Sequence, residues 1–451
     1  MRRRWRDLWV LGAAAVGFGA AIAAVAAAAG GTAAAGSSSD RFIAGAHLPP
    51  LLTLPGEQVT LRYAIVCSPA DPAHDPVGTP CDGGGDVYAR AGHSGPYRRF
   101  ALVRGGDTRD GRDFVELPAA IAASPDGFSY YATLRDNATG ETTTLPAAGA
   151  AAPQNSYPIA DATTVDLGPH RFGATRAPDA RVVRAAWGAG AAEAGLSGGP
   201  GDARVGPASF DVAPDGTVTL LDELNRRIVR WRHGVPSALP LDVATAIDDM
   251  AVGPDGSIYV ADGTRQAGTT PMLRTFAPDG RLVSAQHLPE RTWTQLRVGP
   301  DGPVVQEHPS EQWMPRAGAS DGRAGRPLAD GSRLIVLRTG DDEVRVARVV
   351  NGREHDSWRV RSDTPLGEVQ LADMTGNRLV LVVKAYVETN DEFEVLVLDR
   401  GGLVRRFSVP SAAWAETAPL ARFRLVGTSL YQLGSDSTGV FVDRYDLGGV
   451  S

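Results

Sequence analysis

The sequence predicts an all-β protein built from a repeated unit of short strands. In residues 209–231, hydrophobic side chains alternate with polar ones on either side of a turn, which is the period of a β-strand. The Pro-Asp-Gly turn of this unit returns twice, so that its glycines stand at Gly216, Gly256 and Gly302, 40 and 46 residues apart. Strand repeats of this length are typical of the blades of a β-propeller.

The individual strands follow from the same alternation. The first unit predicts strands at 210–212, 218–220 and 228–231, and a second copy covers residues 249–262. A third copy begins at Gln295 and departs from the pattern after its turn. The next matching turn, at Gly376, comes 74 residues after Gly302. This spacing predicts either one blade with an insertion or two degenerate blades.

An isolated strand before the first repeat predicts how the ring closes. Residues 181–187 match 227–231 in residue type, yet no complete repeat precedes them. The last part of the chain predicts strands at 423–426, 429–433 and 440–445. We expect 181–187 to pair with 440–445, because closure removes two open sheet edges that would otherwise invite association.

Composition and charge narrow the class of protein. The chain has 451 residues, of which 43% are hydrophobic, and has room for more than one globular domain. A net charge of −7 without a basic stripe argues against nucleic acid as a partner. Four arginines among the first six residues precede an uncharged run at 8–29 and small residues at 33–35. This order predicts a signal peptide, with a retained membrane anchor as the alternative, and therefore a secreted or cell-envelope protein.

Shifts in composition divide the chain into parts. We expect a signal peptide or anchor at 1–35, a linker at 36–55, a β-sandwich at 56–149, a linker at 150–160 and the propeller at 161–451. The short alternating strands of 56–149 resemble immunoglobulin-like or fibronectin-like modules in pattern.

Both cysteines of the chain, Cys67 and Cys81, lie in the expected sandwich. An even pair in an exported chain predicts a disulfide bond, and the spacing of Cys67 and Cys81 matches no zinc motif. In the chain-entropy model, closing a loop of this length contributes about 3 kcal/mol of stability.

Residues 221–228 carry a family resemblance. Their sequence, Leu-Asp-Glu-Leu-Asn-Arg-Arg-Ile, resembles the Asp-Asn-Arg-Ile core of NHL repeats, and the match extends over roughly 205–290. The resemblance implies a six-bladed ring, with five blades as the alternative. Because Asp222, Asn225 and Asp262 belong to repeated positions, we expect them to cap turns, since a catalytic group is needed once and not in every repeat.

The inner strands of the expected ring converge on a central axis and supply the candidate site. The binding candidates there are Asp248, Asp249, Gln295 and Arg297. They are accompanied by Glu368, Gln370, Arg422 and Arg424. Alternating acids and arginines favour a self-neutralising lining over a bare cation site.

Similar propellers that act as lactonases or lyases hold a divalent metal at this axis. The Asp248-Asp249 pair is the best metal candidate here, and Asp249 is the residue that we assign to it. Neighbouring strand residues point to opposite faces, however, which argues against a shared ion.

The segment from 307 to 331 predicts a long irregular insertion. It holds Trp313 in a context rich in Pro, Gly and Arg. Such a segment is either a mobile surface loop or a functional one, in which case Trp313 would anchor a partner.

These observations together predict an exported binding propeller of the cell envelope without catalytic activity or cofactor. Its partner would be an extracellular or envelope protein or a glycan, and the membrane would be contacted only through an uncleaved N-terminal segment. The alternative is a metal-dependent hydrolase or lyase of the lactonase-like class, with calcium or another divalent cation.

Overall fold

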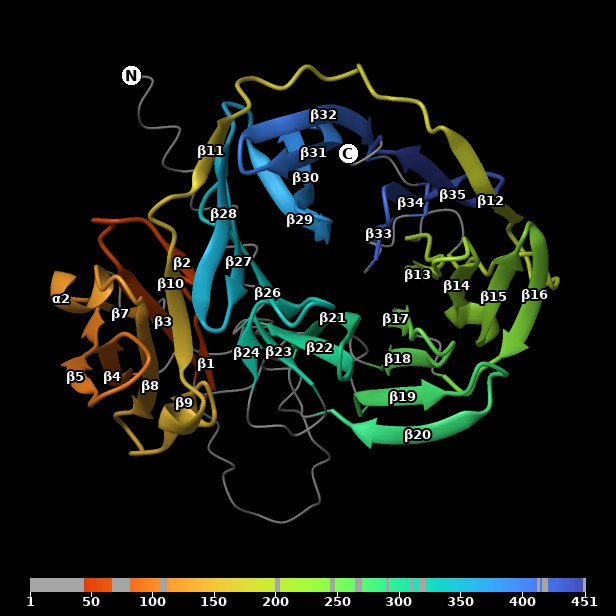
Figure 1. Cartoon of the computed structure of the whole chain (residues 1–451). Helices are drawn as coiled ribbons and strands as arrows, with labels where there is room; N and C mark the ends of the chain where they lie inside the picture. The colour runs from red at the N-terminus through yellow and green to blue at the C-terminus, as the bar shows by residue number, and fades with distance from the viewer. Residues whose placement is uncertain are drawn as a thin grey trace, which may run out of the picture.

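The computed structural model describes residues 44–66, 82–105, 112–198, 203–243, 248–263, 270–288, 292–308, 311–315, 322–411, 414–415 and 421–448. These residues are almost entirely β-strands, as predicted. The regular exceptions are a short helix α2 (Ala119–Ala122) and 3-10 turns η2 (Gly149–Ala151) and η3 (Glu223–Asn225). Figure 1 shows a ring of sheets around an axis, with a separate two-sheet unit beside it.

The N-terminal unit consists of two sheets that face each other. The first sheet contains β1 (Ala44–Ala46), β3 (Thr60–Val66), β7 (Arg112–Glu116) and β6 (Val103–Arg104). The second contains β2 (Leu52–Thr53), β10 (Gln154–Pro158), β8 (Phe128–Asp136), β4 (Gly83–Ala91), β5 (Arg98–Ala101) and β9 (Thr142–Leu145). Alternate residues of β3, β4 and β8, including Leu61, Val87 and Tyr130, form one shared core. The alternation seen in the sequence therefore buries one face of each sheet.

Among the described residues, six further sheets form the ring. The first sheet contains β13 (Ser209–Val212), β14 (Val218–Asp222), β15 (Arg227–Arg232) and β16 (Val235–Pro240). The second contains β17 (Asp249–Val252), β18 (Ile258–Asp262), β19 (Met272–Phe276) and β20 (Leu282–His287). The third contains β21 (Thr292–Gly299), β22 (Gly302–His308), β23 (Gln312–Met314) and β24 (Arg323–Ala324). The fourth sheet contains β25 (Arg326–Pro327), β26 (Arg333–Arg338), β27 (Glu343–Val350), β28 (Arg353–Arg361) and β11 (Thr163–Asp166). The fifth contains β29 (Leu366–Thr375), β30 (Arg378–Val387), β31 (Asn390–Asp399) and β32 (Gly402–Pro410). The sixth contains β33 (Phe423–Val426), β34 (Ser429–Asp436), β35 (Gly439–Asp446) and β12 (Ala180–Ala186). This arrangement is that of a β-propeller.

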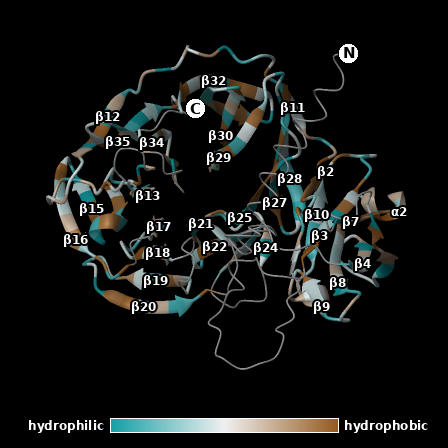
Figure 2. Ribbon diagram, turned by 180° about the vertical axis from the view of Figure 1, so that it is seen from behind, coloured by the Kyte–Doolittle hydropathy of each residue, from teal (hydrophilic) through white to brown (hydrophobic). Residues whose placement is uncertain are grey.

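Hydrophobic cores between neighbouring sheets hold the ring together. The contacts between β13–β16 and β17–β20 include Leu221, Met250 and Phe276. Both hydrophobic and hydrophilic residues occur along outer strands such as β20 and β32 (Figure 2). The repeated turn glycines have a backbone reason, because Gly216 and Gly256 both adopt φ of 82°, a conformation that side chains disfavour.

The predicted closure of the ring is confirmed. Strand β12 pairs antiparallel with β35, so that Ala180 lies opposite Arg444 and Ala186 opposite Gly439. The spacing of 74 residues between Gly302 and Gly376 is resolved as well. The strands β25–β28 of one sheet lie within it, and the turn between β26 and β27 lacks the Pro-Asp-Gly sequence.

A second peripheral pairing was not predicted. Strand β11 adds to β28 in parallel, with Val165 opposite Val360. From there, residues 163–186, which we call the belt, cross the outside of β32 and reach β12 (Figure 1). Thr175 forms a parallel bridge to Ser408 of β32. One segment therefore links the rims of three sheets.

A buried histidine fixes the middle of the belt. The imidazole Nε2 of His170 lies 2.9 Å from a carboxylate oxygen of Glu392, and its Nδ1 contacts Glu394. Arg406 donates to the same Glu394 oxygen at 2.5 Å. Because Glu392 and Glu394 are two positions apart on β31, both point to the side from which His170 approaches.

Two segments expected as linkers contribute strands instead. Within 36–55, β1 and β2 join the sandwich sheets, and within 150–160, β10 pairs with β8. The reason is apolar contact across the domain boundary. Leu52 and Ile159 are buried against Ile335 and Val349 of the propeller. The short apolar run around Leu51 and Leu52 is thus interface and not spacer.

The expected irregular insertion at 307–331 is also corrected. Its described residues hold β23, β24 and β25, and the side chain of Trp313 lies in β23 with only 6% of its surface exposed. Cross-strand pairing with Gln306 and Arg323 places Trp313 within the sheet. A buried strand residue offers little surface to a partner.

No helix in the described part of the chain is long and apolar enough to cross a membrane. The expected signal peptide at 1–35 and the cysteines Cys67 and Cys81 lie outside the described residues.

Candidate functional site

The repeated Asp-Asn-Arg residues form a structural network. Asp222 is buried and accepts hydrogen bonds from the Gly195 amide at 2.9 Å, Asn225 Nδ2 at 2.8 Å and Arg227 Nε at 2.9 Å. Arg227 donates onward to the carbonyl oxygens of Ala189, Gly190 and Glu193. The expected structural role of Asp222 and Asn225 is therefore confirmed, since both anchor the segment that precedes β13.

The structure brings Asp249 and Arg297 together near the propeller axis. Asp249 accepts hydrogen bonds from Ser209 Oγ at 2.6 Å, from its neighbour Met250 N at 2.9 Å and from Leu296 N at 2.7 Å. Arg297 Nη1 lies 3.3 Å from the Asp249 carboxylate. Desolvation, followed by the positive charge of Arg424, lowers the pKa of Arg297. Both carboxylate oxygens of Asp249 thus already face donors from three strands.

Arg424 of β33 reaches two other sheets near the axis. Its Nε donates to the Phe210 carbonyl oxygen at 2.8 Å, and its Nη2 donates to that of Met250 at 2.9 Å. The carboxylates of Asp211 and Asp249 each lie 3.6 Å from this guanidinium. Arg424 therefore joins β33, β13 and β17 by charge-assisted hydrogen bonds.

Arg326 makes a similar link on the other side of the ring. Its Nη2 donates to the Ala372 carbonyl oxygen at 3.1 Å and lies 2.6 Å from Asp373 Oδ1. Near the axis, Arg297, Arg326 and Arg424 each have an aspartate as an ionic partner. This is the alternation of acids and arginines that the sequence suggested.

The other predicted candidates separate. Asp248 is buried and accepts from the Gly263 amide at 2.9 Å, so it faces the end of β18, whereas Asp249 faces Arg297. Gln295 lies opposite Gln306 in the β21–β22 pair. Among the residues that the structure describes, no group of three or more His, Cys, Asp or Glu side chains is arranged to hold a metal ion.

A buried ionic chain joins the two domains. Arg345 of β27 binds Glu57 with two hydrogen bonds, at 2.7 and 3.0 Å, and donates to the Leu52 carbonyl oxygen at 3.0 Å. Its Nε also binds Glu343 at 2.7 Å, and Arg359 binds the other oxygen of Glu343. Desolvation alone would raise the pKa of Glu343, but the hydrogen bonds from Arg345 and Arg359 outweigh it and lower that pKa. The orientation of the sandwich on the propeller is therefore fixed by paired charges as well as by apolar contact.

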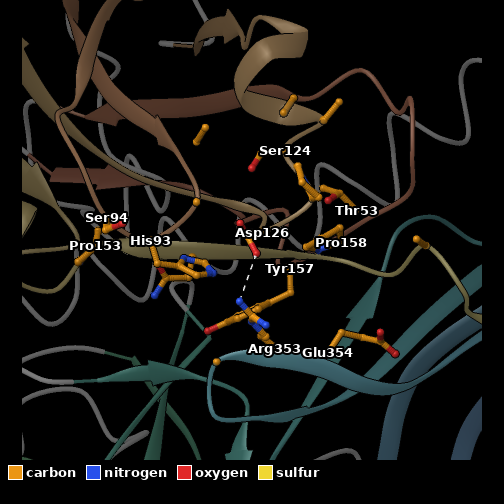
Figure 3. A pocket seen from close by; sticks show the side chains of 18 of the residues that line it. Thr53, His93, Ser94, Ser124, Asp126, Pro153, Tyr157, Pro158, Arg353 and Glu354 are labelled. Atoms are coloured by element: carbon orange, nitrogen blue, oxygen red, sulfur yellow. Dashed lines mark ion pairs between the residues drawn. The ribbon is translucent and has the colours of Figure 1, made fainter.

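Beside this interface lies a large cleft between the domains. Its volume is about 1330 Å³, and its walls come from the loops of the sandwich, from β10 and from the β27–β28 turn of the propeller. Figure 3 shows Asp126 and Arg353 pointing toward each other from opposite walls, with their charged atoms 4.0 Å apart. Tyr157 and His93 line the same space, with ring centres 5.3 Å apart.

Sequence reasoning missed this cleft. The β27–β28 hairpin, which turns at Asn351 and Gly352, forms one wall. The wall residues are separated by up to 301 positions in the chain, from Thr53 to Glu354, and their approach depends on the docking of the two domains.

No protein-family model matches the chain, and none of the curated proteins compared with it does. Several solved structures resemble it. A virginiamycin B lyase from Staphylococcus aureus is 10% identical, covers 53% of this chain and 94% of its own, and has a TM-score of 0.30. A gluconolactonase from Xanthomonas campestris is 13% identical, covers 60% and 99%, and has a TM-score of 0.25. The YCF48 protein bound to a D1 peptide is 15% identical, covers 54% and 78%, and has a TM-score of 0.29.

The proteins named in this comparison include enzymes as well as a peptide-binding protein. Their TM-scores are too low to carry an argument about this chain. The propeller architecture rests on the strand pairing and the closed ring of the chain itself.

Proposed function

We propose that this chain is an exported binding protein of the cell envelope, without catalytic activity of its own, and that its ligand occupies the cleft between the sandwich and the propeller. The observation that carries the proposal is the cleft of about 1330 Å³ between two domains that are held in one orientation. Ligand sites occur preferentially at domain interfaces, and a preorganised site avoids the cost of ordering on binding.

The arrangement of charged side chains at the propeller axis favours a ligand site away from that axis. Arg424 already binds the Phe210 carbonyl oxygen, and the carboxylate of Asp249 already accepts hydrogen bonds from three groups. A metal ion at Asp249 would have to displace these donors, which makes the lactonase-like alternative less favourable. The face that carries Asp248 and Asp249 remains a second surface on which a ligand could rest.

The assignment of the two folds goes with this proposal. We propose that the six sheets are the blades of an NHL-type propeller and that the sandwich is immunoglobulin-like. The Asp222-Asn225-Arg227 network, of which the Asp262–Arg274 ion pair repeats a part, supports the first assignment. The two facing sheets with one shared core support the second.

The proposal is tested by filling the cleft with a bulky side chain and measuring whether the protein still retains its ligand. Ala123 lines the cleft at the end of α2, whereas Ala119 is exposed at the start of the same helix. Purified protein would be incubated with a fractionated extract of envelope glycans and small molecules, washed, and the retained compounds identified by mass spectrometry. We expect wild type and Ala119→Trp to retain the same compound and Ala123→Trp to lose it. Retention of nothing by the wild type would refute the proposal.

The competing enzyme class is tested separately. Lactone and ester hydrolysis would be assayed with and without a chelator, together with metal analysis of the purified protein. Turnover that a chelator abolishes, in protein with stoichiometric metal, would replace the binding role with the lactonase-like one.

A further inference from the structure

The polar groups of the cleft are organised around a buried hydroxyl. Ser129 is fully buried, and its Oγ lies 2.8 Å from Asn155 Oδ1, 3.0 Å from the Gly92 carbonyl oxygen and 3.0 Å from His93 Nδ1. The hydroxyl has one proton, and both oxygen neighbours are acceptors. His93 must therefore donate from Nδ1 to Ser129. This leaves the second ring nitrogen of His93 as an acceptor.

The same hydroxyl sets the orientation of Asn155. Because the amide oxygen of Asn155 faces Ser129, its NH₂ group is available as a donor. Asn155 and His93 both line the cleft. Desolvation, partly offset by a hydrogen bond in which Asn155 accepts from the imidazole, lowers the pKa of His93 and so favours the neutral imidazole. The cleft thus offers one fixed donor and one fixed acceptor side by side.

An aromatic surface adjoins these groups. Asn155 lies opposite Ser129 on the neighbouring strand, and Tyr157 follows two positions later, so Asn155 and Tyr157 share one face of the sheet. The ring of Tyr157 is tilted by 45° against that of His93. Such rings bind C–H surfaces while their polar edges form hydrogen bonds.

The rest of the lining excludes other ligand classes. Leu54 is the only large aliphatic side chain among the residues that line the cleft, so the walls do not suit a lipid. Charges of both signs are present and the pair that spans the opening, Asp126 and Arg353, is mutually compensated. A strongly charged ligand would have to break this balance. The ligand that fits this lining is neutral, is rich in hydroxyl groups and has C–H faces.

We propose that the cleft binds a carbohydrate chain, with Asn155 and His93 hydrogen-bonding to sugar hydroxyls, Tyr157 packing against a sugar ring, and Ser129 acting as the residue that positions the first two. The volume of about 1330 Å³ exceeds that of a typical drug-sized site and suits an oligosaccharide. The ligand class rests on the binding role proposed above.

Binding is tested by calorimetric titration of the purified protein with maltohexaose, cellohexaose, mannohexaose and chitohexaose. We expect at least one of the four to bind, and Asn155→Ala to weaken that binding about 10-fold, which corresponds to about 1.4 kcal/mol. Asn390→Ala, at an exposed hairpin of the propeller, is the matched control and should leave affinity unchanged.

The positioning role of Ser129 has its own readout. We expect Ser129→Ala to weaken binding several-fold and to move the proton of His93 from Nδ1 toward Nε2 in ¹⁵N spectra of the imidazoles. A variant that only loosened the fold would lower the melting temperature without this tautomer change. Unchanged His93 resonances in Ser129→Ala would refute the positioning role.

The outcomes separate the two proposals. If none of the four hexasaccharides binds while the filled-cleft variant still loses a non-carbohydrate compound from the envelope extract, the glycan class is refuted and the binding role stands. If a hexasaccharide binds equally to wild type and to Asn155→Ala, carbohydrate binding lies elsewhere and the cleft assignment is refuted. If neither experiment detects a ligand, both proposals fail.

Discussion

The side chain of Arg424 shows how single residues hold a propeller together. In the described part of the ring, the hydrophobic clusters lie between neighbouring sheets. Arg424 instead binds main-chain carbonyl groups of two neighbouring sheets and lies near two aspartates. Removing it would leave the buried carboxylate of Asp249 without a nearby positive charge on one side.

We expect Arg424→Ala to lower the free energy of unfolding by about 3–5 kcal/mol, the range for breaking a buried ion pair. Arg232→Ala is the matched control, because the Arg232 side chain is 72% exposed and its partner Asp215 is 4.0 Å away. Its effect should stay below about 1 kcal/mol. Urea denaturation measures both, and equal losses would show that Arg424 is not a link between sheets.

Glu223 predicts a dependence of stability on pH. It is buried in η3, and desolvation, aided by the negative charges of Asp248 and Asp222, raises its pKa well above the ordinary value. The folded state therefore holds this proton more tightly than the unfolded state. The stabilising contribution is complete below the unfolded pKa and is lost as the pH rises through the folded pKa.

We expect Glu223→Gln, which cannot ionise, to show a smaller loss of stability than wild type as the pH rises above the ordinary pKa of a glutamate. Each unit of pKa shift corresponds to about 1.4 kcal/mol. Thermal melts of both proteins across this range give the comparison. Parallel curves would mean that Glu223 does not titrate differently in the two states.

The cysteines give a prediction that rests on sequence alone. We expect Cys67 and Cys81 to be bonded in exported protein, because both lie in a chain with export features and form an even pair. Intact-mass analysis after alkylation without reductant decides it. Two alkylated thiols would overturn the assignment.

Among the contacts between strands, the pairing of β12 with β35 is the easiest to test. A chain that ends at Thr438 lacks β35 and leaves the buried residues Val183 and Ala185 of β12 without a partner strand. We expect such a protein to melt far below wild type or to remain unfolded. A chain that ends at Gly448 retains β35 and should melt like wild type. Equal melting of both truncated chains would contradict closure by β12.

Local patterns were enough to predict many of these elements. Strands such as β13, β14, β33 and β34 follow a period of two, and their turns need glycine with positive φ, so the sequence marks both. The pairing of β12 and β35 was also predictable, because each end of the repeats carries a strand with an unpaired edge, and pairing these two strands closes the ring.

Other elements depend on contacts that no local pattern encodes. Strand β11 has four residues and pairs in parallel with a strand almost 200 positions away. Trp313 stands in a stretch rich in Pro and Gly, which indicates a loop until its neighbours Gln306 and Arg323 supply hydrogen bonds. At the axis, the sequence named Asp249 and Arg297 among the candidates, and the structure brings them together. The residues of the cleft meet only because the domains dock.

For the whole molecule, the interface between sandwich and propeller determines whether the two domains behave as one body. The apolar contacts of Leu52 and Ile159 and the ion pairs of Arg345 cross it together. Arg345 is buried and has carboxylates on both sides. Its loss would leave Glu343 and Glu57 facing each other without the shared cation.

We expect Arg345→Ala to destabilise the interface by about 3 kcal/mol or more and to split a single calorimetric transition into two. Arg361→Ala, which removes an exposed pairing with Asp166, should leave one transition. If Arg345→Ala still melts in a single step at the wild-type temperature, the ion pair does not couple the domains.

The order in which the chain is made gives the belt a further consequence. Ala186 and Gly439 are partners in the closed ring, yet 252 residues lie between them. At translation rates of about 5–20 residues per second, β12 waits roughly 10–50 s for the strand that covers it. The sandwich can fold during this interval, because all of its strands precede the belt. The propeller cannot close during this interval, and the unpaired β12 can pair with β35 of another chain instead. Several ribosomes that translate the same mRNA would therefore favour domain-swapped rings, in which β12 of one copy completes the last sheet of its neighbour.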